Sequence, residues 1–340
     1  MTDFTELIDL ASERLGGAII YANDDFFAPK ENLLKASAPI FREGLYTDRG
    51  KWMDGWESRR RRTPGFDWCI VRLGLAGRVR GVVVDTSYFR GNYPEQCSLE
   101  ACAVEGHPTV EQLIGDANEW TQLLPVSQLK GDSQNLFEIE TAARATHLRF
   151  KIYPDGGVAR LRVYGEVLPD WSRLIRRGGE IDLASVEHGG RVVACSDMFF
   201  GHRHNLIMPG RALDMSDGWE TKRRRGAGHD WAIVRLGARA RTIKRIEVDT
   251  SHFKGNYPDT CSLEACDLGE ETTNDIDWSS LAWREVLSRT KLQAHTRQEF
   301  EEEIAGTSAA THLRFNIYPD GGISRLRVYC EPEAESLSNW

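Results

Sequence analysis

The chain contains the same sequence blocks twice, in the same order, and this repetition limits the folds it can adopt. Asp54–Glu57 returns as Asp217–Glu220, and Gly91–Pro94 returns as Gly255–Pro258. Repeats of about 20 to 50 residues build solenoids, in which each unit depends on its neighbours, whereas a unit of roughly 150 residues can enclose its own hydrophobic core. The sequence therefore predicts two tandem domains of the same fold.

The shared blocks also set the domain boundaries. We expect a first repeat with a short N-terminal helix in residues 1–168 and a second repeat in residues 181–332, followed by a C-terminal tail in 333–340. Residues 169–180 contain a proline, paired arginines and paired glycines, which are typical of an exposed linker. The first copy has about ten additional residues ahead of Asp54, which predicts a loop that only this copy possesses.

Strand signals dominate each repeat. In the first copy, Trp68–Gly74 and Val82–Asp85 are short apolar runs, typical of strands buried on both faces. Apolar and basic residues alternate along His147–Tyr164 and Pro154–Gly157 provides a turn, which predicts a β-hairpin with one apolar and one cationic face. Helical spacing is confined mainly to Phe4–Ala11. The most economical architecture is all-β, with two antiparallel β-sandwiches of jelly-roll type.

The charge of the chain limits its partners. Lys and Arg number 43 against 51 Asp and Glu, so the net charge is −8 and the long-range field repels polyanions. We therefore expect neither nucleic acid nor a membrane surface as a partner. The acidic N-terminal segment has no basic start followed by an apolar run, and no stretch of about 18 apolar residues occurs. These features predict a cytoplasmic protein.

The cysteines are predicted to be free thiols. Cys97 and Cys102 lie in the hexapeptide Cys-Ser-Leu-Glu-Ala-Cys, which Cys261 and Cys266 repeat. If this segment is a strand, a separation of five puts the two sulfurs on opposite faces, which prevents both a disulfide and a shared metal ion. Buried thiols and the odd total of seven cysteines also suit a reducing compartment.

The duplicated blocks closely resemble the allantoicase family. They are Asp54–Glu57 with its basic run, Gly65–Trp68, Val84–Ser87, Phe89–Pro94 and His147–Gly157, and the likeness covers nearly the whole chain. The resemblance implies two tandem galactose-binding-like jelly-roll domains and the hydrolysis of allantoate to ureidoglycolate and urea in purine degradation. Fold alone would not imply this activity, because such sandwiches are more often binding modules.

The repeats contain the residue types that this chemistry needs. Allantoate is a small carboxylate whose central carbon carries two ureido groups, so a site requires a cationic fork, groups that pair with ureido N–H and C=O, and an acid and a base. The substrate-binding candidates are Arg60, Arg223, Asn92, Tyr93, Asn256, Tyr257, Glu57 and Glu220. The catalytic candidates are Glu100, Glu264, Asp67 and Asp230.

Each candidate also has a structural interpretation. The basic runs Arg59–Arg62 and Lys222–Arg225 could be solvated faces, although flanking acids such as Asp67 are expected to fix one arginine in each run. Asn92 could pair with a ureido group, and the tyrosine beside it could equally belong to the core. Glu100 could act as an acid or base if burial raises its pKa, but an exposed glutamate would only add solubility.

The sequence contains few signals for metal binding or covalent catalysis. His202 and His204 have a spacing that suits metal ligands, but no third ligand is close in sequence. No cofactor is assigned, and a divalent metal stays open. His229 replaces Phe66 of the first copy, which points to functional asymmetry between the repeats. Because neither a phosphate loop nor a nucleophile elbow occurs, we expect general acid and base catalysis with water as the nucleophile.

Two other functions compete with hydrolysis. One is a non-catalytic tandem binding module for a carbohydrate or another small polar ligand, and the other is a scaffold that assembles through arginine-rich faces. His147 and Arg149 share one face of a predicted strand, which suits either a cationic pocket or a subunit interface. A homo-oligomer is expected.

Overall fold

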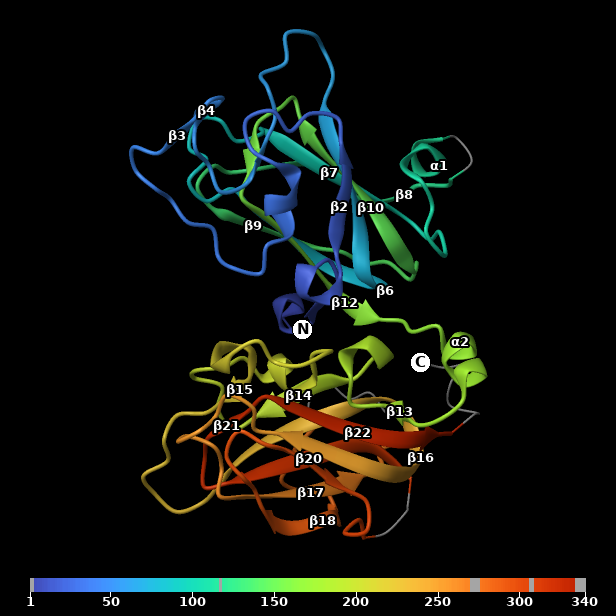
Figure 1. The fold of residues 1–340 in the computed structure, drawn as a ribbon. Helices are drawn as coiled ribbons and strands as arrows, with labels where there is room; N and C mark the ends of the chain where they lie inside the picture. Colours follow the sequence, from blue (N-terminus) through green and yellow to red (C-terminus); the bar gives the residue numbers. More distant parts are fainter. Residues whose placement is uncertain (1–2, 116–117, 270–275, 306–308, 334–340) are drawn as a thin grey trace. The chain divides into compact units, whose positions relative to one another are not determined.

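The computed structural model describes residues 3–115, 118–269, 276–305 and 309–333. The chain divides between Leu168 and Pro169 into two compact units, and each unit is built mainly of antiparallel strands (Figure 1). The two units repeat the same strand order, so the fold is all-β, with two tandem β-sandwich domains.

The first unit contains twelve strands among its described residues, together with short helices. The strands are β1 (Ile8–Asp9), β2 (Ala18–Ala22), β3 (Tyr46–Thr47), β4 (Gly50–Lys51), β5 (Trp56–Glu57), β6 (Asp67–Asp85), β7 (Gln96–Cys102), β8 (Thr121–Gln128), β9 (Gln134–Glu138), β10 (Ala145–Tyr153), β11 (Gly157–Val158) and β12 (Arg160–Val167). The helices are α1 (Val110–Ile114) and the 3-10 turns Phe4–Glu6, Glu13–Leu15 and Lys30–Leu34.

The second unit repeats this arrangement. Its strands are β13 (Ile181–Asp182), β14 (Arg191–Cys195), β15 (Trp219–Glu220), β16 (Asp230–Asp249), β17 (Thr260–Cys266), β18 (Arg284–Lys291), β19 (Arg297–Phe300), β20 (Ala310–Tyr318), β21 (Gly322–Ile323) and β22 (Arg325–Pro332). Its helices are α2 (Trp171–Arg177), which lies in the predicted linker, and the 3-10 turns Val186–His188, Arg203–Ile207 and Met215–Asp217.

One long strand organises each sandwich. The first part of β6 pairs with β2 and β10, and its last part pairs with β9 and β12. Gly74 and Gly77 lie between these parts, where the backbone passes close to other chain segments. A Cβ at Gly74 would lie 2.5 Å from the Leu15 carbonyl oxygen, and one at Gly77 would lie 2.3 Å from that of Glu166. The two apolar runs predicted as separate strands are therefore one strand that serves both layers.

The predicted hairpin over His147–Tyr164 is wrong. β10 and β12 do not pair with each other, because β6 and β7 occupy the two edges of β10 while β12 pairs with β1 and the far part of β6. Between them the chain turns and forms β11, which pairs with β5. The alternation of apolar and polar residues indicated two strands correctly, but it did not specify their partners.

The N-terminal segment is less helical than its spacing predicts. A single 3-10 turn, Phe4–Glu6, is followed at once by β1, which pairs with β12. The Asp9 carboxylate accepts hydrogen bonds from the backbone N–H groups of Val163 and Ala11, at 2.9 and 3.2 Å. These bonds tie the segment to the sheet, so a helix does not continue through this region.

The loop specific to the first copy, residues 35–53, is mostly exposed and contains only the small β3–β4 hairpin. The seven cysteines are all free, and all except the half-buried Cys195 are buried. Within the described part of the chain, no helix is long and apolar enough to span a membrane.

Candidate functional site

Three loops meet at one end of the first sandwich. The Asn92 carboxamide donates to Glu57 Oε1 at 2.7 Å, and the Gly157 N–H donates to the Asn92 carbonyl oxygen at 2.7 Å. The Arg61 N–H donates to Asp155 Oδ2 at 2.8 Å. The structure therefore brings the predicted residues Glu57 and Asn92 together and connects them to the basic run that follows β5.

The arginines of the basic run have different partners. Arg59 pairs with Asp24 and Arg61 with Asp67, both at 2.6 Å. Arg60 lies between them, is exposed, and makes no ion pair or side-chain hydrogen bond among the described residues. It lines a hollow of about 280 Å³ that also includes Asp67. The sequence predicted that Glu57 or Asp67 fixes one arginine of this run, and the ion pair with Arg61 shows that Asp67 does so.

The candidate Asp67 is almost completely buried. Its Oδ1 accepts hydrogen bonds from Asn23 at 2.9 Å and from Arg61 at 2.6 Å. Its Oδ2 is buried and has no partner among the described residues. This carboxylate therefore fixes the basic run, and its buried Oδ2 keeps an unused acceptor position.

Glu57 has an altered acidity. Burial raises its pKa, and the hydrogen bond from Asn92 only partly opposes this effect. The neighbouring Tyr93 is half-buried and packs against a small core cluster of Met53, Phe89 and Ala159. The structural interpretation of Tyr93 thus accounts for its position, and Tyr257 of the second unit is likewise half-buried.

The second unit repeats the loop cluster. Asn256 donates to Glu220, Arg224 pairs with Asp230, and the Arg224 N–H donates to Asp320 Oδ2 at 2.8 Å. Arg223 takes the place of Arg60: it is exposed and has no ion pair within the described ranges. The carboxylate of Asp230, like that of Asp67, is 1% exposed.

Glu100 lies on the outer face of the sheet, and its pKa is lowered, not raised. Burial would raise the pKa of Glu100, but hydrogen bonds from Lys151 and Arg149, both at 2.6 Å, together lower it. The reason is the strand register, which places Arg149 of β10 directly opposite Glu100 of β7. The Arg149 guanidinium also lies over the Trp120 ring, 4.6 Å from its centroid.

The corresponding face of the second unit has a different network. Glu264 accepts hydrogen bonds from Arg314 at 2.7 Å and from the Asn316 carboxamide at 2.8 Å, and these bonds lower its pKa although burial would raise it. Asn316 Oδ1 lies 3.1 Å from His229 Nε2, and the His229 ring packs on Tyr318 with centroids 4.5 Å apart.

The contact between His229 and Asn316 could have been found by comparing the two copies. In the first copy these positions are Phe66 and Lys151, so both members of the contact differ together. Asn316 is not among the functional residues predicted from the sequence, because the sequence does not show which strands lie beside its own.

Among the described residues, no third ligand is arranged to hold a metal ion together with His202 and His204. His204 is buried and its Nε2 contacts the Val192 carbonyl oxygen at 3.2 Å, and the two rings lie with centroids 5.0 Å apart. Burial, together with the neighbouring His202, lowers the pKa of His204 to about 3. Residues 3–115, 118–269, 276–305 and 309–333 contain no group of three or more His, Cys, Asp or Glu side chains arranged to hold a metal ion.

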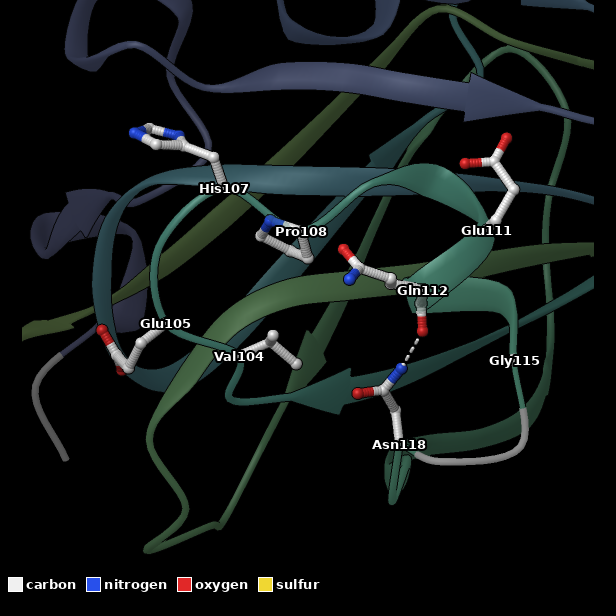
Figure 2. Close-up of a pocket in the computed structure, with 8 residues that line it drawn as sticks. All are labelled: Val104, Glu105, His107, Pro108, Glu111, Gln112, Gly115 and Asn118. Carbon is white, nitrogen blue, oxygen red and sulfur yellow. Dashed lines mark hydrogen bonds between the residues drawn. The ribbon is translucent and has the colours of Figure 1, made fainter.

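A larger hollow, of about 540 Å³, lies beside α1. Its lining includes His107 and Glu111, and Figure 2 shows these side chains pointing away from each other. None of the predicted site residues lines this hollow, and its polar groups do not converge on a common point. The loop cluster at the end of each sandwich and the outer face of the sheet that carries Glu100 or Glu264 are therefore the stronger candidates for a functional site.

Comparison with known proteins shows the family of the chain. The family model described as the allantoicase repeat matches residues 8–168 and 181–333. A probable allantoicase of Photobacterium profundum is 49% identical, covering 96% of this chain and 97% of that protein, and one of Stutzerimonas stutzeri is 48% identical, covering 96% of each. The crystal structure of allantoicase from Saccharomyces cerevisiae is similar with a TM-score of 0.81 and 35% identity, covering 95% of this chain and 93% of that one.

The repeated strand order and the duplicated polar loops define a protein of two tandem β-sandwich domains with the same loop cluster in each. The family match covers both repeats, and the relatives are similar over nearly their whole length. The chain belongs to the allantoicase family.

Proposed function

We propose that the chain hydrolyses allantoate to ureidoglycolate and urea, and that the substrate carboxylate binds to Arg60 and to its counterpart Arg223. Membership of the allantoicase family supports the reaction. The observation that carries the binding site is the exposed guanidinium of Arg60, which has no ionic partner among the described residues although both neighbouring arginines are paired. A planar guanidinium can hold a carboxylate through two parallel hydrogen bonds.

The ureido groups have partners close to this arginine. Asp67 lines the same hollow as Arg60, and its buried Oδ2 can accept a hydrogen bond from a ureido N–H. Glu57 lies at the start of the loop that carries Arg60, and Asn92 of the loop between β6 and β7 pairs with it, so the two side chains offer both a carboxylate and an amide. In the second unit, Asp230 occupies the place of Asp67.

The glutamates of the outer face have a supporting role in this proposal. Glu100 is held by two cationic side chains and Glu264 by one cation and one amide, and the resulting low pKa keeps each carboxylate charged. A carboxylate in this state is a poor proton donor. We therefore assign Glu100 and Glu264 as positioning residues.

A coupled assay for urea tests both parts of the proposal. The double variant R60M/R223M should raise the KM for allantoate about 10- to 150-fold, because a hydrogen bond to a charged group contributes about 1.5–3 kcal/mol. The matched control R62M/R225M removes the same number of exposed charges from the same runs and should leave KM unchanged. A folded parent protein that releases no urea would contradict the reaction, whereas an unchanged KM in R60M/R223M would contradict only the site.

We also propose that the chain forms a homo-oligomer, in which a second copy covers Phe199 and Phe200. These rings are 70% and 62% exposed, whereas in the first unit Arg49 of the additional loop packs over the corresponding Phe26 ring, 5.2 Å from its centroid. Exposed aromatic pairs of this kind are typical of interfaces. Light scattering of F199S/F200S should show a smaller mass than the parent protein, and equal masses would contradict the proposal.

A further inference from the structure

The outer face of the second unit holds a chain of hydrogen-bonded polar side chains. Arg314 donates to Glu264, and Asn316 donates from its Nδ2 to Glu264 Oε2 at 2.8 Å and to Ser262 Oγ at 3.2 Å. Asn316 Oδ1 faces His229 Nε2 at 3.1 Å. The half-buried His229 is the end of this chain, where the network reaches the surface.

We propose that His229 is a catalytic residue that accepts a proton from water in the second unit, and this proposal rests on the proposed hydrolysis of allantoate. The bonds of Asn316 determine which ring nitrogen is available. Because its Nδ2 donates to a carboxylate, its Oδ1 is the acceptor and His229 Nε2 must carry the proton. The His229 Nδ1 atom therefore has a free lone pair, which is the requirement for a general base.

The arrangement follows the logic of other catalytic histidines. A base is oriented by a third group that holds its other nitrogen, and here Asn316 holds His229 while Glu264 and Arg314 hold Asn316. The stack on Tyr318 further fixes the plane of the imidazole. A ring held from one nitrogen and one face has little freedom left, so its basic nitrogen keeps one direction.

The first unit lacks this base. Phe66 takes the place of His229 and packs on Tyr153 with centroids 5.3 Å apart, so the ring contact is preserved without a titratable nitrogen. Lys151 takes the place of Asn316 and pairs with Glu100 at 2.6 Å. We therefore assign turnover to the second unit, and the first unit retains only the binding groups.

His229 is also well placed in the sequence relative to the carboxylate-binding arginine. It directly precedes Asp230, whose carboxylate holds Arg224, and it ends the loop that carries Arg223. One loop thus carries both the proposed anchor for the substrate carboxylate and the proposed proton acceptor.

The chemical step balances with water as the only co-reactant. The water oxygen forms a bond to the central carbon of allantoate as His229 Nδ1 takes one of its protons, and the bond from that carbon to one ureido nitrogen breaks. The proton then passes from Nδ1 to the departing nitrogen, which gives urea and ureidoglycolate. His229 returns to its starting state, as a general base must.

Replacement of His229 by the residue of the first unit tests the proposal. H229F preserves the ring contact, and H229Q preserves an N–H donor for Asn316, but neither variant can accept a proton. We expect kcat to fall about 100- to 10,000-fold in both variants with little change in KM, as for loss of a general base. The matched control F66L changes the corresponding ring of the first unit and should keep the parent kcat.

A pH profile separates a proton acceptor from a merely structural residue. The charged and titratable side chains that face this network are Glu264, Arg314, Arg289 and Tyr318. The pH profile of kcat/KM of the parent should contain a limb that is absent from the profile of H229Q. A kcat within threefold of the parent for H229F and H229Q would overturn the proposal while leaving the reaction intact. A parent without turnover would overturn both.

Discussion

The buried ion pair between Arg160 and Asp54 provides a quantitative test of the fold around the first site. Its side chains are 1% and 6% exposed, and Arg160 Nη2 lies 2.7 Å from Asp54 Oδ2. The same guanidinium donates to the carbonyl oxygens of Asp54 and Ala159 at 2.9 and 2.8 Å and to that of Ser37 at 2.9 Å. It therefore connects β12 to the additional loop and to the segment that leads into Glu57.

The variant R160M removes the buried cation and leaves the Asp54 carboxylate beside an apolar side chain, with only the partly exposed Lys35 ammonium as an ionic partner at 3.3 Å. Removal of one partner of a buried ion pair costs about 3–5 kcal/mol, whereas an exposed pair contributes about 1 kcal/mol or less. For a domain of about 150 to 250 residues, each kcal/mol lowers Tm by about 2–4 °C, so the first unit should unfold about 6–20 °C below the parent. Methionine fills most of the lost volume, which limits the contribution of a cavity.

Calorimetry of the unfolding transition that belongs to the first unit measures this difference in Tm. R90M is the control, because Arg90 is 81% exposed and its pair with Asp132 lies at the surface. The double variant R160M/D54L should recover much of the lost stability, since it leaves no unpaired buried charge. The free energy of unfolding of R160M should be at least ~3 kcal/mol below that of the parent. A difference of less than about 1 kcal/mol would refute the reasoning.

Three further predictions concern acidity and the second network. Burial raises the pKa of Asp9 from 3.8 to about 6, so its contribution to stability is present below about pH 4 and is lost as pH rises through about 6. Urea denaturation of D9N should show a flatter dependence on pH in this range. Burial lowers the pKa of His204 from 6.5 to about 3, so the contribution of the neutral imidazole to the free energy of unfolding is present above pH 6.5 and is lost as pH falls toward 3. The variant H204Q should therefore lose less stability than the parent over this range of pH. The variant F66H/K151N, made in H229F, should recover part of the lost urea release by rebuilding the network in the first unit, and no recovery would mean that the loop around it also differs.

Repetition and alternation predicted much of the fold. Two copies of a long unit required two similar domains, and apolar periodicity marked the strands of both layers correctly. The pairing of strands could not be predicted in the same way, because an apolar run shows that a strand is buried but does not identify its neighbours. The shared strand β6 and the separation of β10 from β12 depend on contacts between distant segments.

The same limit applied to the candidate site. The pair of Arg61 and Asp67 was predictable, since the two residues are close in sequence and opposite in charge. The acidity of Glu100 was not, because its cationic partners lie about 50 residues away and reach it only through the register of β7 and β10. The protonation of a candidate residue therefore depends on neighbours that its own sequence segment does not show.

The differences between the repeats suggest how duplication divided their roles. In the first unit Lys151 neutralises Glu100 directly, and the pair ends the network. In the second unit Asn316 takes the place of the lysine and uses both ends of its amide, so that the carboxylate of Glu264 is connected to His229. An amide can relay orientation in this way because it donates and accepts at once, whereas an ammonium group only donates. A histidine without the amide would lack a fixed tautomer, and the amide without the histidine would have no base to orient, so the two changes are useful only together.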